Sequence, residues 1–298
     1  MSTEPTTVAF IGLGIMGAPM AANLVKAGFD VVGHNRSQAS VQALAAQGGR
    51  AANSTAEAVR GADIVITMLP DSPDVDEVIT GPDGLLEHSH PGQLVIDMST
   101  IRPDVSRRIA TVAARVGVRV LDAPVSGGEA GAIEGNLSIM VGGEEADFEA
   151  ARPVFEAVAT TIVHVGPHGA GQTVKAANQL IVAGNIQLLA EAVVFLESCG
   201  VDLECGLRVL GGGLAGSTVL DRKSEAMRTR AFTPGFRLAL HHKDMGIVTA
   251  AAREAGIVIP LGSVVAQLIA ALVARGDGQL DHSALLKLTA ELSGRPTG

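Results

Sequence analysis

The chain has 298 residues, of which 47% are hydrophobic and 18% charged, and its net charge at pH 7 is −9. This length allows two domains with their own cores, and the negative charge argues against nucleic acid as a partner. No apolar run is long enough for a membrane helix, and the first residues lack the basic segment of a signal peptide. We therefore expect a cytoplasmic protein with no membrane partner. Two cysteines, Cys199 and Cys205, are too few for a disulfide framework or a zinc site, and we expect them to be small core residues.

A glycine-rich loop follows the first predicted strand, the apolar segment 8–11. Its three glycines have the spacing G-x-G-x-x-G, and a helical pattern over 18–27 comes next. In a dinucleotide site the first glycine permits a tight turn, the second lets the backbone approach a pyrophosphate, and the third allows close packing of helix on strand. The phosphates would then lie at the positive N-terminus of the helix. The predicted cofactor-binding residues of this loop are Gly12, Leu13, Gly14, Ile15, Met16 and Gly17.

The end of the second predicted strand, 30–33, indicates which cofactor binds. An NAD site has an Asp or Glu here that accepts from the ribose 2′-hydroxyl. This chain has Asn35 instead, followed by Arg36 and Ser37, which could both donate to a 2′-phosphate. A solvated turn is the alternative interpretation. We predict that the three residues bind cofactor, with NADP(H) favoured and NAD(H) also allowed.

The remaining strands alternate with helical patterns, which predicts a Rossmann-type, doubly wound and mostly parallel sheet. Ligands bind at the C-terminal ends of the strands in such sheets. Strands are predicted at 63–69, 93–98, 119–121, 137–141 and 161–165. Candidates at strand ends are Met68, Leu69, Pro70 and Thr100 for the cofactor, and Ser126, Gly127 and Gly128 for a substrate.

The pattern changes after Gly171. Residues 172–199 contain no proline and have apolar residues at helical spacing, which predicts an unusually long helix. Nothing after it has the pattern of a strand. We therefore predict an N-terminal dinucleotide-binding domain over 1–167 and an all-α domain over 168–298 that begins with a long interdomain helix.

Two lysines are candidates for chemistry. Lys175 and Asn178 lie three residues apart on the predicted long helix, so their side chains share a face near the expected cleft. Taken alone, Lys175 is better interpreted as a solvated lysine. Lys243 and Asp244 could form a surface ion pair or present a cation to the cofactor. The eight histidines have no metal-binding spacing, so no metal is expected.

Four segments, in matching order, resemble motifs of the β-hydroxyacid dehydrogenase family. They cover residues 10–20, 122–129, 169–178 and 236–244. The resemblance implies that Lys175 is a catalytic acid and base and that Asn178 is its partner. It also implies that Lys243 lies by the cofactor. The substrate-binding residues that it implies are Ser126, Gly127, Gly128, Phe236 and Asp244.

Residues 208–221 and 281–284 are most similar to the branch of this family that reduces tartronate semialdehyde, or 2-hydroxy-3-oxopropionate, to D-glycerate. Two residues of this sequence depart from the family's pattern and limit which cofactor contacts can be carried over. Asn35 replaces the acidic residue of NADH-preferring relatives, and Asp74 replaces an asparagine that lies near the cofactor in the isobutyrate enzymes. The alternatives are another substrate, namely 3-hydroxyisobutyrate, succinic semialdehyde or glyoxylate, and a non-catalytic NADP-binding sensor. The resemblance further implies a homodimer or homotetramer assembled through the helical domain.

Overall fold

The computed structural model describes residues 5–296. The chain divides into two compact units, residues 1–175 (unit 1) and residues 176–298 (unit 2). The division falls inside one continuous helix, α9 (Ala170–Ser198). The sequence interpretation placed the domain boundary before this helix, at 167/168, whereas the compact units separate within its second turn.

Unit 1 contains a nine-stranded sheet whose order is β3-β2-β1-β4-β5-β6-β8-β7, with β9 paired to β8. The pairs from β3 to β6 are parallel, and β8 pairs antiparallel with both β6 and β7. The Rossmann-type, mostly parallel sheet is therefore confirmed. The strands are β1 (Thr7–Ile11), β2 (Asp30–His34), β3 (Arg50–Ala51), β4 (Ile64–Thr67), β5 (Leu94–Asp97), β6 (Arg119–Asp122), β7 (Val125–Ser126), β8 (Leu137–Gly142) and β9 (Ala159–Gly166).

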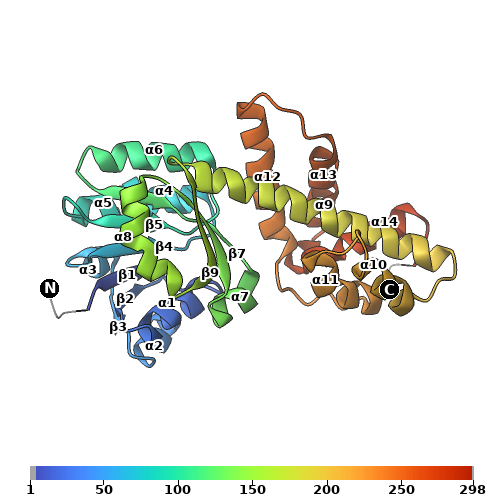
Figure 1. Cartoon of the computed structure of the whole chain (residues 1–298), viewed down its shortest axis with the longest axis horizontal. Helices are drawn as coiled ribbons and strands as arrows, with labels where there is room; N and C mark the ends of the chain where they lie inside the picture. Colours follow the sequence, from blue (N-terminus) through green and yellow to red (C-terminus); the bar gives the residue numbers. More distant parts are fainter. Residues whose placement is uncertain (1–4, 297–298) are drawn as a thin grey trace. The chain divides into compact units, whose positions relative to one another are not determined.

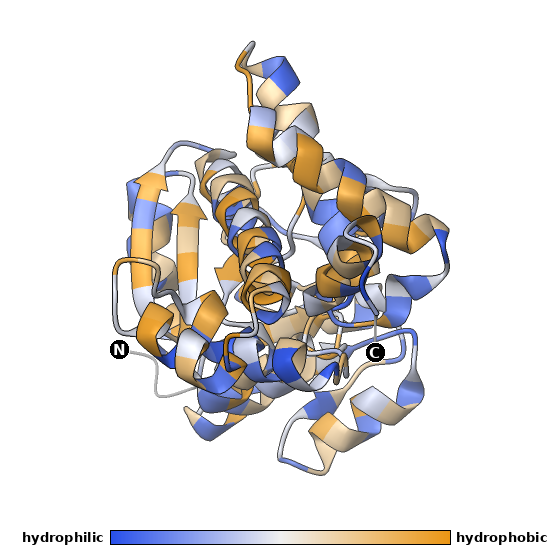
Figure 2. Cartoon of the chain, turned by 90° about the vertical axis from the view of Figure 1, so that its right-hand side faces the viewer, coloured by the Kyte–Doolittle hydropathy of each residue, from blue (hydrophilic) through white to orange (hydrophobic). Residues whose placement is uncertain are grey.

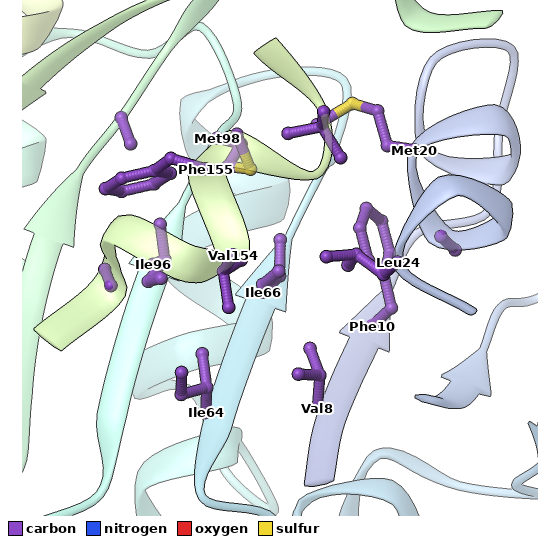
Figure 3. Close-up of a cluster of buried hydrophobic side chains, with 14 of the residues drawn as sticks. Val8, Phe10, Met20, Leu24, Ile64, Ile66, Ile96, Met98, Val154 and Phe155 are labelled. Atoms are coloured by element: carbon purple, nitrogen blue, oxygen red, sulfur yellow. The ribbon is translucent and has the colours of Figure 1, made fainter. Parts of the chain in front are cut away.

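Each central strand buries both of its faces, so alternate residues contribute to two separate cores. On one face, Val8 and Phe10 of β1 pack with Ile64 and Ile66 of β4. Figure 3 shows this cluster, with Leu24 of α1 beside Phe10. On the other face, Ala9, Ile11, Val65 and Val95 join a second cluster, with side chains from α3, α4 and α6. Helices therefore cover both faces of the sheet, as Figure 1 shows.

The helices of unit 1 are mostly short connections between strands. The first of them ends where the sequence pattern predicts, since Gly28 follows it with a left-handed φ of 94°. They are α1 (Gly17–Lys26), α2 (Gln38–Ala45), α3 (Thr55–Val59), α4 (Ser72–Thr80), α5 (Leu85–His88), α6 (Pro103–Ala114), α7 (Gly128–Glu134) and α8 (Glu145–Glu156).

Unit 2 is helical, and within the described residues it has no strand, only an isolated bridge between Arg237 and Asp281. Its core contains Ile186, Val193, Ile247 and Ile269, among others. The helices of this unit carry both hydrophobic and hydrophilic residues around their circumference, whereas the strands of unit 1 are largely hydrophobic (Figure 2). After α9, the elements are α10 (Leu203–Gly211), α11 (Thr218–Thr229), α12 (Leu238–Glu254), α13 (Pro260–Ala274), η1 (Asp277–Gln279), η2 (His282–Ala284) and α14 (Leu285–Leu292).

The α9 helix is the one described helix that is long and apolar enough to cross a membrane. Half of its most apolar 18-residue window is buried inside the protein. Its first turn is also hydrogen-bonded to the sheet of unit 1 through Gln172. We therefore treat α9 as a core helix, and the cytoplasmic location stays a prediction.

Two details differ from the sequence interpretation. The strands β3 and β7 have two residues each, too few to produce a recognisable alternation. Cys199 and Cys205 are exposed, so their assignment to the core is wrong. Cys199 follows the last residue of α9, and Cys205 is in the first turn of α10, where Asp202 accepts from its backbone N–H at 2.8 Å.

Candidate active site

The glycine loop after β1 has the conformation that dinucleotide binding requires. Gly12 has a left-handed φ of 102°, and a Cβ there would overlap the carbonyl oxygen of Met68. A Cβ on Gly17 would overlap the carbonyl oxygen of Gly12. A Cβ on Gly14, by contrast, would have no heavy atom within 4 Å. The loop is therefore closely packed at its first and third glycines and open at the second, which is where a pyrophosphate would approach the backbone.

This loop lies at the point where the strand order reverses. Strand β1 is flanked by β2 on one side and β4 on the other, and the chain continues outward in both directions. The backbone N–H of Met68 donates to Ile11 at 2.9 Å, and that of Leu69 donates to the Ser99 hydroxyl at 2.9 Å. Pro70 is exposed and Thr100 half-buried at the same ends of neighbouring strands. The structure thus brings the glycine loop, residues 68–70 and Thr100 to the switch point at which open α/β sheets bind ligands.

Asn35 connects the end of β2 to the glycine loop. Its Oδ1 accepts from the backbone N–H of Leu13 at 3.2 Å, and its Nδ2 donates to the carbonyl of Ser37 at 3.4 Å. Arg36 and Ser37 are exposed. No acidic side chain follows β2 before α2, so the ribose-binding carboxylate of an NAD site is missing from this strand end.

The predicted substrate-binding residues Ser126, Gly127 and Gly128 span the junction of β7 and α7. Ser126 pairs with Ser138 on β8. Gly127 and Gly128 have φ values of 143° and 67°, which L-residues with side chains rarely adopt. A Cβ on Gly128 would have no heavy atom within 4 Å, so the backbone is accessible at this point.

The first turn of α9 is anchored to the ends of β5 and β6. The Asp122 carboxylate accepts from the backbone N–H of Gly169 at 2.7 Å and of Gln172 at 2.9 Å. The Gln172 side chain donates to the carbonyl of Ser99 at 2.8 Å and accepts from Ile101 N–H at 3.0 Å. Burial raises the pKa of Asp122, and the two N–H groups oppose that rise. The sequence interpretation did not identify Gln172, although its position one turn before Lys175 was a usable signal.

Lys175 follows this anchor by one turn and is buried, with 7% of its surface exposed. A lysine is rarely buried unless its ammonium has partners. The interpretation of Lys175 as a solvated surface lysine is therefore wrong. Lys175 is therefore a buried amine one turn away from anchored backbone.

Within unit 2, the other predicted residues of this region form a hydrogen-bonded chain. Lys243 Nζ lies 2.9 Å from Asp244 Oδ1, and Gln179 Nε2 donates to Asp244 Oδ2 at 2.5 Å. Gln179 Oε1 accepts from Asn178 Nδ2 at 2.8 Å. Asp244 is 3% exposed, so the pair with Lys243 is not the surface ion pair that the sequence allowed. Gln179, which the sequence interpretation did not identify, connects three predicted site residues.

Phe236 is held in place by a buried cluster in unit 2. The Asp281 carboxylate accepts from the backbone N–H of Phe236 at 3.0 Å and from Lys223 Nζ at 2.9 Å. The Phe236 ring lies 5.8 Å from His241 and 5.3 Å from His282, between ring centroids, and the two histidines are joined through their Nδ1 atoms at 3.1 Å. Burial lowers the pKa of His282, so this ring is neutral near pH 7.

No cluster of histidine, cysteine, aspartate or glutamate suited to a metal ion occurs among residues 5–296. The fold and the glycine loop at its switch point define a dinucleotide-binding protein of the Rossmann type.

Comparison with known proteins gives the family. Residues 7–166 match the NAD-binding domain of 6-phosphogluconate dehydrogenase, and residues 169–289 match the NAD-binding region of NADP-dependent 3-hydroxyisobutyrate dehydrogenase. The chain therefore belongs to the β-hydroxyacid dehydrogenase family, which includes 3-hydroxyisobutyrate dehydrogenase, and is an oxidoreductase that uses a nicotinamide cofactor.

Several relatives are similar over almost their full length. The 2-hydroxy-3-oxopropionate reductase of Escherichia coli (strain K12) is 42% identical over 279 residues, which are 93% of this chain and 95% of that protein. The NAD-dependent L-serine dehydrogenase of Pseudomonas aeruginosa is 40% identical, covering 94% and 97%. Among solved structures, 3-hydroxyisobutyrate dehydrogenase of Mycobacterium tuberculosis with L-serine has a TM-score of 0.87 and 38% identity, covering 95% of this chain and 98% of that one.

Proposed function

We propose that this enzyme reduces tartronate semialdehyde to D-glycerate and that it prefers NADPH. The observation that carries the proposal is the buried Lys175, one turn after a helix start that Asp122 and Gln172 tie to the strand ends. The similarity to 2-hydroxy-3-oxopropionate reductase supports this substrate. The preference for NADPH is supported by Asn35, Arg36 and Ser37 at the end of β2, where a carboxylate would repel a 2′-phosphate.

In this reaction the residues of the chain bind the substrate and donate a proton to it. The substrate carboxylate would accept from backbone N–H groups around Gly127 and Gly128, which have no side chains to obstruct it. Bound NADPH supplies the hydride that reduces the aldehyde carbon. As the aldehyde oxygen becomes negative, the Lys175 ammonium would stabilise that charge and donate the proton that completes the alcohol. In the reverse direction, the neutral lysine would remove the proton of the alcohol.

A panel of substrates with both cofactors tests the proposal. Tartronate semialdehyde, methylmalonate semialdehyde, succinic semialdehyde and glyoxylate are reduced, and D-glycerate, 3-hydroxyisobutyrate and L-serine are oxidised, each with NADP(H) and NAD(H). We expect the highest kcat/KM for tartronate semialdehyde with NADPH. A higher kcat/KM for another substrate would show that the enzyme has a different activity within the family. Cofactor binding without turnover of any substrate would support a non-catalytic NADP-binding sensor instead.

The role of Lys175 has its own test. Lys175→Ala should lower kcat by about 10²–10⁴-fold, as expected for the loss of a positioned acid, with the Kd for NADPH nearly unchanged. Lys26→Ala, which removes an exposed lysine of α1, is the matched control and should retain wild-type kcat. A Lys175→Ala enzyme with near-normal turnover would exclude this residue as the proton donor.

L-serine is the second candidate substrate. The L-serine dehydrogenase of Pseudomonas aeruginosa is 40% identical, and the Mycobacterium tuberculosis relative was solved with L-serine. L-serine and D-glycerate share a three-carbon skeleton with a C1 carboxylate and a C3 hydroxyl, and they differ in the group on C2 and its configuration. The panel above distinguishes them directly.

We further propose that the enzyme is a homodimer or homotetramer that assembles through α9. Ile181, Leu188 and Phe195 are spaced seven residues apart and are 63%, 51% and 68% exposed. Large apolar side chains at this spacing form one stripe along a helix, which favours a helical partner. Light scattering should show the wild type as an oligomer and the double variant Ile181→Lys, Leu188→Lys as a monomer. Val116→Lys, at an exposed apolar position in unit 1, should remain oligomeric.

A further inference from the structure

The amide of Gln179 is fixed at both ends by buried hydrogen bonds. Its Nε2 donates to Asp244 Oδ2 at 2.5 Å, and its Oε1 accepts from Asn178 Nδ2 at 2.8 Å. Gln179 is 5% exposed and Asp244 is 3% exposed, so water does not readily replace either bond. Both neighbours, Asn178 and Asp244, are residues that the family resemblance places in the site.

The Asp244 carboxylate determines which way both amides point. An ionised carboxylate can only accept, so the Gln179 group facing it must be the NH₂ end. The oxygen of Gln179 then faces Asn178, and an oxygen can accept only from the Asn178 NH₂ group. Asn178 therefore donates an N–H to Gln179, and its own oxygen, Oδ1, points away from Gln179. Lys243 Nζ, 2.9 Å from Asp244 Oδ1, stabilises the ionised carboxylate on which this order depends.

We propose that Gln179 is a positioning residue that orients Asn178 so that its Oδ1 accepts a hydrogen bond from the 2-hydroxyl of the substrate. This inference rests on the proposed function, because it concerns the tartronate semialdehyde that Asn178 would bind. An amide oxygen recognises a hydroxyl donor and disfavours a carboxylate, which can only accept. The orientation therefore selects 2-hydroxy substrates over analogues that lack this group.

Gln179→Met tests the proposal, because methionine fills a similar volume and removes both hydrogen bonds. We expect kcat/KM for tartronate semialdehyde to fall about ten- to a hundred-fold. For malonate semialdehyde, which has no 2-hydroxyl, we expect a change of less than about threefold. The Kd for NADPH should stay within about twofold of the wild-type value.

Gln187→Met is the matched control. Gln187 lies on the same helix, is also 5% exposed and donates to Glu191 at 2.9 Å and to Thr289 at 3.3 Å. Gln187→Met should lose as much thermal stability as Gln179→Met. Its ratio of kcat/KM for tartronate semialdehyde to kcat/KM for malonate semialdehyde should stay at the wild-type value. A purely structural role for Gln179 would make the two variants behave alike.

A double-mutant cycle separates this inference from the proposed function. If Gln179 acts through Asn178, then adding Gln179→Met to Asn178→Ala should cause little further loss of kcat/KM. Independent, multiplicative losses would overturn the proposal. The wild-type substrate panel decides the proposed function separately. If another substrate is best, the cycle is measured with that substrate, and multiplicative losses there again contradict a role through Asn178.

Gln179→Glu gives a second readout in case the methionine variant folds poorly. A glutamate retains an acceptor for Asn178 but places a carboxyl group against Asp244. The two carboxyl groups then need a shared proton, which raises one of their pKa values. We expect kcat of this variant to increase as pH falls towards 5, relative to the wild type. A pH profile parallel to that of the wild type would contradict the proposed hydrogen-bonded connection from Asp244 through Gln179 to Asn178.

Discussion

The carboxylate of Asp122, at the end of β6, accepts a hydrogen bond from the backbone N–H of Gln172 in the first turn of α9, at 2.9 Å. The Gln172 side chain in turn contacts the backbone of Ser99 and Ile101 beyond β5. Two strand ends therefore fix the start of one helix. Lys175 lies one turn further on, so its position depends on this anchor.

Gly171 must be a glycine for this anchor to form. A Cβ there would overlap the carbonyl oxygen of Met140 and lie 2.7 Å from the Asp122 carbonyl oxygen. We expect Gly171→Ala to destabilise the protein by about 1–3 kcal/mol and to lower kcat, because the start of α9 must shift. Gly246→Ala, at an exposed position of α12 with no heavy atom within 4 Å of the new Cβ, should instead stabilise by up to about 1 kcal/mol. Thermal unfolding and kcat of the two variants check this. Equal stability of the two would mean that α9 does not pack closely on the strand ends.

The fold could be predicted from the sequence because its determinants are local. The apolar runs of β1, β4 and β5, the glycine loop after β1 and the long proline-free segment of α9 all lie within contiguous stretches. The doubly wound sheet then follows from the alternation of strands and helices. The positions of the candidate residues at strand ends were predictable for the same reason, since topology brings the ends of parallel strands to one edge.

The hydrogen-bonded connections could not be predicted, because they join residues far apart in the sequence. Gln179 bonds to Asp244, 65 positions later, and Asp281 bonds to Phe236 across 45 positions. A glutamine or an aspartate in a helical pattern is equally compatible with a solvated position. The contact between His241 and His282 is likewise visible only once α12 and η2 pack together.

Asn35 should control the choice between NADPH and NADH. Asn35→Asp keeps an acceptor for the Leu13 N–H but adds a negative charge where a 2′-phosphate would bind. We expect the ratio of kcat/KM for NADPH to that for NADH to fall at least about tenfold, which corresponds to about 1.4 kcal/mol. Arg36→Ala should weaken the binding of NADPH and leave the binding of NADH unchanged. A wild-type preference for NADH would refute the assignment of this strand end to a 2′-phosphate.

Asp97 should make stability depend on pH between about 4 and 6. Burial raises its pKa from the ordinary value of 3.8 to about 6, although hydrogen bonds from Ser99 and Thr67 oppose the rise. In this range the folded protein therefore binds more protons than the unfolded chain, so stability falls as pH increases. The difference between the two pKa values corresponds to about 3 kcal/mol. Urea unfolding at pH 4 and pH 6.5 should show this fall in the wild type and a smaller one in Asp97→Asn. Identical pH dependence in the two proteins would contradict it.

The ion pair between Lys223 and Asp281 should stabilise unit 2 and the segment that carries Phe236. Asp281 is 1% exposed, and its carboxylate also accepts from the Gly235 and Phe236 N–H groups. Burial would raise the pKa of Asp281, but the hydrogen bonds from the Lys223 ammonium and the Phe236 N–H outweigh it and hold this pKa below its usual range. The stabilisation is therefore present above about pH 4 and is lost as pH falls below that value.

Lys223→Met tests this pair, because it leaves the buried carboxylate without its cation. We expect a loss of about 2–4 kcal/mol at pH 7, measured by urea unfolding, and a smaller loss at pH 3, where Asp281 in the folded variant can take up a proton and is no longer an uncompensated charge. Lys287→Met is the matched control, since Lys287 pairs with the more exposed Asp277 at 2.9 Å and should contribute less than about 1 kcal/mol. Adding Asp281→Asn to Lys223→Met should recover part of the loss, because the uncompensated charge is then removed. If the single lysine variants were equally stable at pH 7, the buried carboxylate would not need Lys223, and the backbone N–H groups alone would hold it.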